Sequence, residues 1–209
     1  TGSKTVQKHM KAVMKACIEL GVPLFGPMAG SPGLRRPHQP LVFPVRAEHR
    51  DEFNALVRHG ASIGLKRVGL FHADSDTGRQ HLENVKLAAQ DAGVAFALSM
   101  PFKSDASDAQ LDDFVKAIAA QKVDMVLNHG SAGVYERLIR RTRATGSATT
   151  FFAVNSGSTQ LAAALGPLGH GMVFAQVLPS PWARKTAIAR EYQDAFGRAH
   201  PDRDFSYGS

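Results

Sequence analysis

Hydrophobic residues follow two spacings along this chain: short continuous runs, and repeats of three or four residues. Gly64 ends a helical repeat, an apolar run follows at residues 67–71, and a loop of small polar residues opens the next helical repeat near Arg79. Helix, short apolar strand, loop and helix in this order are typical of an open parallel sheet, whose ligands collect at the carboxyl ends of the strands. This stretch is the unit that the chain repeats.

The repetition predicts an α/β lobe with a parallel sheet and flanking helices, self-sufficient from roughly Glu48 to Gln176. Glycines end several helical repeats, and Ser107 has the position of an N-cap. The expected buried stripes include Ile63 on the helix before the first strand and Leu87 on the helix after it. The expected strands begin near Arg67, Val94, Val123, Thr150 and Gly171, and the expected helices cover about 48–63, 78–92, 107–118, 133–144 and 159–164.

The two ends of the chain carry less regular patterns. We expect a helix at about 5–20, strands at 22–25 and 41–45, a Gly- and Pro-rich loop at 26–33, and a final helix at 183–198. So few elements bury too little surface to form a stable lobe alone.

Composition limits the function classes. The 209 residues are 44% hydrophobic and 21% charged, and no apolar run reaches the length of a membrane span or reads as a signal-peptide core. A net charge of +7 invites a nucleic-acid role, but the basic residues are spread out, apart from a group at Arg137, Arg140, Arg141 and Arg143 that fits the solvated side of a surface helix. Cys17 is the only cysteine and is expected to be buried and inert; no disulfide or thiolate zinc cluster can form within the chain.

Sequence signatures of cofactors are missing. No strand is followed by Gly-x-Gly-x-x-Gly, and neither a P-loop nor His-Glu-x-x-His occurs. The run His72-Ala-Asp74-Ser-Asp76 could bind a hard metal ion, but Asp and Ser at that place are more typical of a helix cap. We therefore predict no cofactor and no metal.

The run from Asn128 to Gly133 could be compared with the nucleophile turn of a serine hydrolase. That turn requires Gly-x-Ser-x-Gly, and His129 occupies the first glycine's place before Ser131. His170 could be a base, but no suitably spaced acid precedes it. A serine hydrolase using Ser131 is an alternative that this pattern disfavours.

Three pieces, at 21–31, 41–47 and 67–79, have the order and spacing of a known family. Together they resemble the middle of a type I periplasmic solute-binding protein of the branched-chain amino acid group, the receptors of ABC importers. The resemblance implies two α/β lobes that bind a small polar or carboxylate-bearing, amino acid-like metabolite between them, a periplasmic location, and membrane subunits of an importer as partners. It implies no enzyme activity, nucleic-acid binding or membrane insertion. A ligand-sensing domain of a regulator with the same fold is the alternative.

The resemblance also implies a division of the chain. Residues 1–46 would be part of an N-terminal lobe, 47–177 the C-terminal lobe, and 178–209 a return crossover and a helix of the N-terminal lobe. Because the N-terminal lobe would then be incomplete, we expect the chain to be an internal piece of a longer protein or to have lost the remainder.

The residues that the resemblance places at the ligand lie in four loops. The first-lobe loop would supply a carboxylate site, and Asn155 lies where amino acid binders place an acidic partner for the ligand ammonium. A neutral Asn155 favours a ligand with a carboxylate or a neutral polar head over a free amino acid. The implied ligand-binding residues are Met28, Ala29, Gly30, Ser31, Thr77, Ser131, Ala132 and Asn155.

Overall fold

The computed structural model describes residues 2–103, 105–154 and 158–205. The chain divides into two compact units, Thr1–Glu52 and Phe53–Ser209, with the division inside one helix, α2 (His49–Ser62). The assignment of residues 178–209 to the first lobe stays a prediction.

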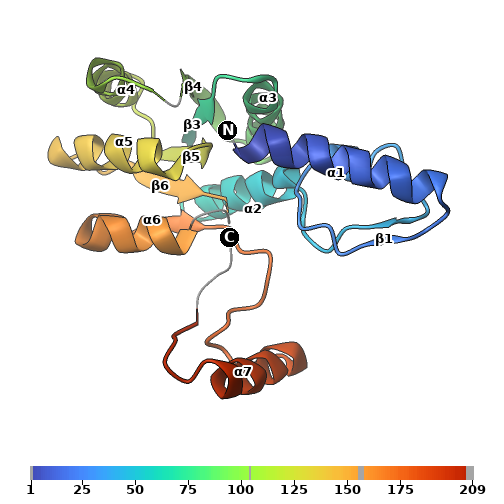
Figure 1. Ribbon diagram of the computed structural model, residues 1–209. Helices are drawn as coiled ribbons and strands as arrows, with labels where there is room; N and C mark the ends of the chain where they lie inside the picture. Colours follow the sequence, from blue (N-terminus) through green and yellow to red (C-terminus); the bar gives the residue numbers. More distant parts are fainter. Residues whose placement is uncertain (1, 104, 155–157, 206–209) are drawn as a thin grey trace. The chain divides into compact units, whose positions relative to one another are not determined.

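The second unit is built on a five-stranded parallel sheet (Figure 1). The strand order β4-β3-β5-β6-β7 places β3 and β5 at the centre, where every residue from Val68 to His72 and from Met125 to Asn128 is buried. Burial on both faces explains why these strands read as continuous apolar runs. The predicted parallel sheet is therefore confirmed. Its strands are β3 (Arg67–Ala73), β4 (Ala95–Phe102), β5 (Met125–His129), β6 (Thr150–Ala153) and β7 (Val173–Phe174).

Helices cover both faces of this sheet and enclose two cores. On one face Phe53 of α2 and Val85 of α3 (Asp76–Asp91) pack against Leu70 and Leu127. On the other face lie α4 (Asp108–Ala120), α5 (Ala132–Ala144) and α6 (Ser158–Leu165), followed by the short turn η2 (Gly166–Gly169). Consecutive strand residues alternate between the two cores, as the pleat of a strand requires.

Tyr135 of α5 ties the helix layer to the sheet. Its side chain is fully buried and its hydroxyl lies 2.9 Å from the Val126 carbonyl oxygen and 3.0 Å from that of Phe152. Burial raises the pKa of this phenol well above its ordinary value. The buried hydroxyl therefore acts as a neutral donor to β5 and β6.

Several predicted details were wrong. Ile63 is 56% exposed, because α2 ends at Ser62, before this residue. Leu87 is 57% exposed, because it lies on a side of α3 that faces away from the sheet. The last strand is shorter than the expected 171–177. The final helix, α7 (Ala187–Ala199), begins later than Ala183, because the Thr186 hydroxyl accepts a hydrogen bond from the Ala189 N–H and caps it there.

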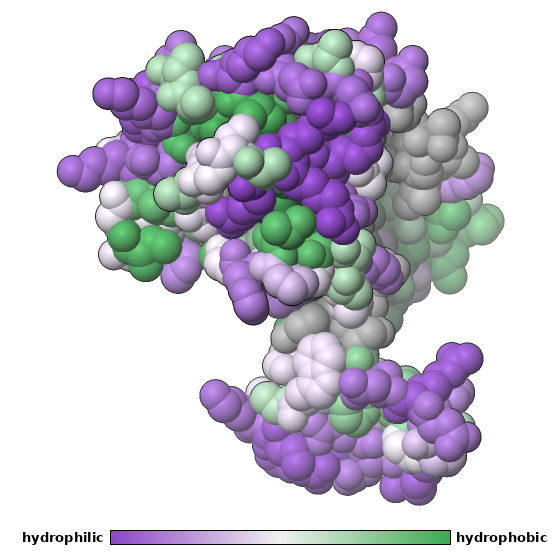
Figure 2. All heavy atoms as spheres, turned by 90° about the vertical axis from the view of Figure 1, so that its left-hand side faces the viewer, coloured by the Kyte–Doolittle hydropathy of each residue, from purple (hydrophilic) through white to green (hydrophobic). Residues whose placement is uncertain are grey.

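The surface helices carry the charge. Arg137 and Arg141 both form ion pairs with Asp108, and Arg140 pairs with Glu136 at 2.9 Å. The space-filling view from the side of α4, α5 and α6 shows hydrophilic side chains over most of the surface, with smaller hydrophobic areas between them (Figure 2). Arg137, Arg140 and Arg141 thus form ion pairs on the partly exposed side of α5, which agrees with the predicted solvated side of a surface helix.

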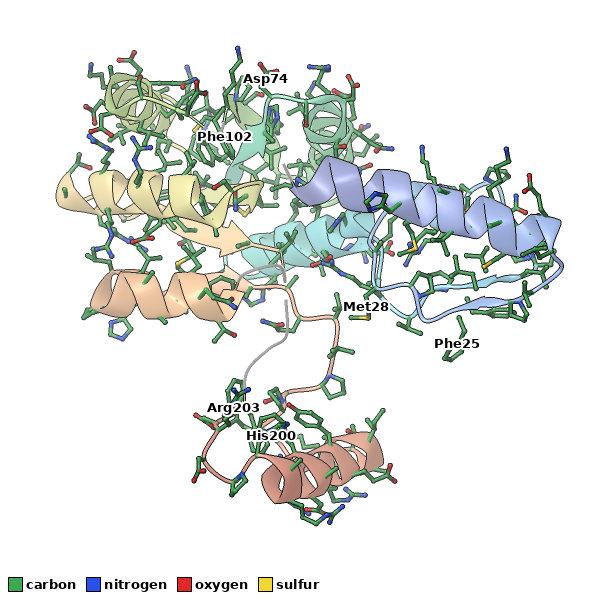
Figure 3. All side chains as sticks on the ribbon, viewed as in Figure 1. Phe25, Met28, Asp74, Phe102, His200 and Arg203 are labelled. Carbon is green, nitrogen blue, oxygen red and sulfur yellow. The ribbon has the colours of Figure 1, made fainter. Side chains whose placement is uncertain are left out.

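The first unit is small. Its two strands pair in parallel, and among its described residues the only buried hydrophobic side chains are Leu34 and Val42. Phe25 is 81% exposed and projects from its strand (Figure 3), and Cys17 is half-buried rather than buried as expected. The unit contains α1 (Gly2–Glu19), β1 (Leu24–Phe25), the 3-10 turn η1 (Pro32–Leu34) and β2 (Val42–Phe43).

Residues 181–205 form a local aromatic cluster around α7. Phe196 packs against Tyr192, Phe205 and His200, with ring centroids 5.1–5.5 Å apart. The chain turns after the helix, where the Arg203 N–H donates to the His200 carbonyl; both residues are labelled in Figure 3. None of the described helices combines the length and the apolarity that a membrane crossing needs.

Candidate ligand site at the carboxyl edge of the sheet

Three serines mark the edge of the sheet at which its strands end, called here the carboxyl edge. The Ser75 hydroxyl accepts from Gly78 N–H at 3.1 Å, that of Ser107 from Gln110 N–H at 3.2 Å, and that of Ser131 from Val134 N–H at 3.5 Å. They cap α3, α4 and α5, which follow β3, β4 and β5. Three helix N-termini, each with partial positive charge, therefore share one edge.

The structure brings three of the predicted ligand residues to this edge. Thr77 lies in the first turn of α3, and Ser131 and Ala132 begin α5. Strands β3 and β5 are neighbours and end in register, with His72 opposite His129. Ser131 is exposed, and Thr77 and Ala132 are partly so. Asn155 follows the adjacent strand β6 and lies outside the described residues.

Two carboxylates at this edge, Asp74 and Asp76, already have a partner. Arg79 forms ion pairs with both Asp74 and Asp76, the first at 3.5 Å. The Asp74 N–H donates to the Phe102 carbonyl oxygen at 2.7 Å, and Figure 3 labels both residues at this edge. With Ser75 as the cap of α3, these contacts favour the capping interpretation of His72–Asp76 over a metal site.

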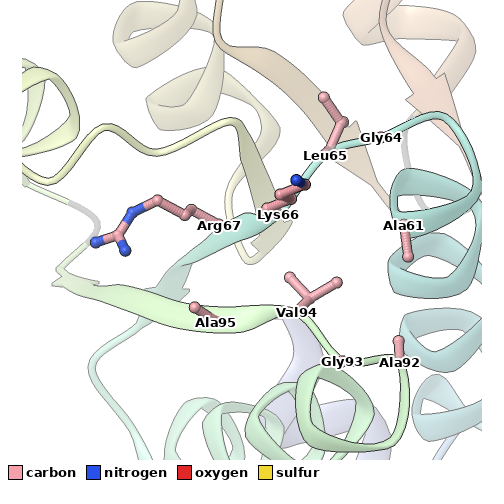
Figure 4. A pocket seen from close by; sticks show the side chains of 9 residues that line it. All are labelled: Ala61, Gly64, Leu65, Lys66, Arg67, Ala92, Gly93, Val94 and Ala95. Carbon is pink, nitrogen blue, oxygen red and sulfur yellow. The ribbon is translucent and has the colours of Figure 1, made fainter.

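An open hollow of about 450 Å³ lies beside Asp74 at the same edge, in the loop between β4 and α4. Its charged side chains are Asp74, Lys103 and Asp105, and Ser107 and Gln110 add polar groups. None of the ligand-binding residues implied by the resemblance lies in this loop. A second hollow of about 560 Å³ lies at the opposite edge, lined by Lys66 and Arg67 and by small or apolar residues (Figure 4). None of the predicted ligand residues that the structure describes lines either hollow.

His72 lies one residue from the end of β3. Its Nδ1 is 3.1 Å from the Ala73 carbonyl oxygen, and its Nε2 is 2.9 Å from the Ser99 hydroxyl. Burial lowers the pKa of this imidazole, so the neutral form is favoured. A neutral ring with Nδ1–H can donate to the carbonyl and accept from the serine.

The four predicted residues of the first unit, Met28–Ser31, form a loop held mainly through its backbone. Arg35 Nη1 donates to the carbonyl oxygens of Ala29 and Ser31 at 3.1 and 3.0 Å, and the His49 N–H donates to that of Gly30 at 3.2 Å. The Ser31 hydroxyl accepts from Gly33 N–H at 3.4 Å and caps η1. Met28 is half-exposed (Figure 3).

Asn128 is a polar residue that sequence reasoning did not assign to the site. It lies in β5 between Phe71 and Ala153, is 6% exposed, and its Oδ1 has no hydrogen-bond partner among the described residues. An unsatisfied buried amide oxygen is costly. The signal available in the sequence was one amide directly after the apolar run Met125–Leu127.

Sequence comparison decides the family. The profile of the family described as "Periplasmic binding protein" matches residues 6–209, nearly the whole chain. The chain belongs to the periplasmic binding protein family. This match confirms the resemblance stated from the sequence. A comparison with curated proteins gives no match.

Solved structures of periplasmic binding proteins agree with this assignment. An extracellular ligand-binding receptor from Verminephrobacter eiseniae is 25% identical, with a TM-score of 0.72 over 85% of this chain and 51% of that one. A possible leucine/isoleucine/valine-binding protein from Rhodopirellula baltica is 23% identical, with a TM-score of 0.76 over 91% and 53%. A solute-binding protein of an ABC transporter from R. palustris, in complex with benzoate, is 18% identical, with a TM-score of 0.62 over 78% and 44%.

This periplasmic binding protein chain spans about half the length of the solved structures it matches. The family and these neighbours are substrate-binding proteins and not enzymes. The Ser131 hydroxyl, which caps α5, fits that role, and the hydrolase alternative is set aside.

Proposed function

We propose that the chain is part of an extracytoplasmic substrate-binding protein of an ABC importer, and that the carboxyl edge of its five-stranded sheet contacts the solute. The observation that carries the proposal is the meeting of Thr77, Ser131 and Ala132 at the ends of the adjacent strands β3 and β5. Membership of the periplasmic binding protein family supports the binding role, a location outside the cytoplasm and membrane subunits of an importer as partners.

The solute that fits this edge carries a carboxylate or a neutral polar head. The capped N-terminus of α5 has partial positive charge, and Ser131 and Thr77 add hydroxyl donors. Asp74 and Asp76 are paired with Arg79, and Asn155, at the position that the resemblance gives to an acidic partner, is neutral. A free amino acid whose ammonium lay against the neutral Asn155 would lack a carboxylate partner there, which costs several kcal/mol.

Benzoate in one solved relative is a carboxylate of this class, and the name of another is that of a possible leucine/isoleucine/valine-binding protein. Isothermal calorimetry on the protein encoded by the complete reading frame can separate carboxylates without an ammonium group from amino acids. The probes are benzoate and octanoate for the first class, and leucine, isoleucine and valine for the second. We expect benzoate and octanoate to bind at least about tenfold more tightly than the amino acids, a difference of about 1.4 kcal/mol.

Variants of Ser131 test the role of the edge without removing the cap. Ser131→Asn and Ser131→Asp both keep a good N-cap, but only aspartate adds a negative charge. We expect Ser131→Asp to weaken carboxylate binding by about a hundredfold or more and Ser131→Asn to weaken it much less, because like charges repel by several kcal/mol. Thr186→Asp makes a matched change at the cap of α7 and should leave binding unchanged.

Micromolar binding of leucine, undiminished in an Asn155→Ala variant, would overturn the ligand class and the role of that residue. Equal affinities of Ser131→Asn and Ser131→Asp for benzoate would show that the edge does not contact the solute. The complete reading frame gives a further test: a signal peptide is expected before residue 1, whereas a DNA-binding module would indicate the regulator alternative.

A further inference from the structure

A pair of histidines meets under the carboxyl edge on the α3 side of the sheet. His81 is in the second turn of α3 and is 2% exposed; His129 is the last residue of β5 and is half-buried. Their ring centroids are 3.8 Å apart, and the rings are tilted by 48°. Each ring offers a nitrogen within 4.8 Å of one on the other.

We propose that His81 and His129 form a binding site for a late first-row divalent ion such as Zn²⁺, Ni²⁺ or Cu²⁺. Imidazole is a preferred ligand of these ions. Two nitrogens bound to one ion at about 2.0–2.1 Å lie at most about 4.2 Å apart, so a small ring rotation completes the geometry. Water or another donor would fill the remaining coordination positions.

The surroundings hold the pair in place. The Phe53 ring packs against both, with its centroid 5.4 Å from that of His81 and 6.2 Å from that of His129. The backbone of His129 is fixed by the register of β5 against β3. The pair is thus preorganised by one helix and one central strand, which are more rigid than loops.

A third histidine, His72, lies near the pair and is not part of the proposed site. It lies beside His129 in the parallel register, but its nitrogens are engaged with Ala73 and Ser99. His81 and His129 are selected by the close approach of their rings, whose centroids are 3.8 Å apart. Neither position belongs to the residues proposed for the solute, so the ion site is independent of the proposed function.

The test is calorimetric titration of the untagged protein with ZnCl₂, NiCl₂ and CuCl₂, with Co²⁺ absorption as a spectroscopic check. We expect one ion per chain, and a loss of affinity of at least about tenfold in His129→Asn, since even the removal of outer-shell partners costs that much. His129 is half-buried, so this variant should fold, which circular dichroism checks. His129→Cys should retain Zn²⁺, because a thiolate is also a zinc ligand.

His81→Asn should lose the ion in the same way; if this buried change unfolds the chain, His129→Asn and His129→Cys still decide. The exposed His170 gives the control His170→Asn, which should bind as the wild type does. Binding unchanged in His129→Asn would overturn the proposal. Equal losses in His129→Asn and His170→Asn, or no binding at all, would overturn it too.

Discussion

Two glycines in the first turns of sheet-edge helices should respond to the same substitution with opposite signs. Gly78 lies in α3, three residues after its cap Ser75, and Gly133 lies in α5, two residues after its cap Ser131. A Cβ on Gly78 would be 2.9 Å from the Ala73 carbonyl carbon, 3.0 Å from His72 Nδ1, and closer still to the Ala73 oxygen. Among the described residues, a Cβ on Gly133 would meet only the Ser131 hydroxyl, at 4.0 Å.

The magnitudes follow from these distances. Alanine is about 0.5–1 kcal/mol better than glycine in a helix, so Gly133→Ala should raise the free energy of unfolding by up to that amount. Gly78→Ala must push the first turn of α3 away from the backbone at the end of β3. Overpacking of this kind costs about 1–3 kcal/mol and exceeds the gain in helix propensity. The gain in helix propensity is common to both variants, so the two should differ by the overpacking cost, about 1–3 kcal/mol.

Urea unfolding followed by far-UV circular dichroism measures both variants against the wild type. In a chain of this length 1 kcal/mol shifts the melting temperature by about 2–4 °C, so a thermal scan gives an independent check. Hydrogen exchange should show the loss in Gly78→Ala concentrated in the first turn of α3. A Gly78→Ala variant as stable as Gly133→Ala would refute the close approach of α3 to β3.

Two further predictions concern buried polar groups. Tyr135→Phe should lower the free energy of unfolding by about 1–2 kcal/mol in urea melts, because the Val126 and Phe152 carbonyls lose a buried donor; an unchanged midpoint would contradict that bond. The lowered pKa of His72 means that protonation favours the unfolded chain. The contribution of the neutral His72 ring to the free energy of unfolding is therefore present above pH about 6.5 and is lost as the pH falls further. Urea melts between pH 7.5 and 5 should show a smaller fall for His72→Gln; an identical fall would assign the pH dependence to other groups.

The fold could be predicted from the sequence where burial leaves a periodic trace. Strands β3 and β5 are buried on both faces and appear as apolar runs, and glycines or caps such as Ser107 mark the helix ends. The predictions were wrong where the burial of a residue depends on elements that are distant in the sequence. Leu87 continues the apolar spacing of its helix, but nothing in the sequence shows that α3 turns it away from the sheet.

The candidate site was predictable in part for the same reason. Thr77 and Ser131 each follow a recognisable strand, and the parallel order of the sheet brings such positions to one edge. His81 and His129 could not be paired in advance, because their contact depends on which face of α3 lies against the sheet. The hollow beside Asp105 depends on the path of a loop, which local sequence does not determine.

The capping and binding interpretations of the edge serines are compatible. A serine hydroxyl has two acceptor lone pairs and one donor hydrogen. In capping α5, the Ser131 oxygen accepts from the Val134 N–H, and the hydroxyl hydrogen remains available to a solute carboxylate. Alanine at this position would remove both functions and confuse a loss of stability with a loss of binding. The comparison of asparagine and aspartate keeps the cap in both variants, so a difference in affinity between them reports the charge of the solute.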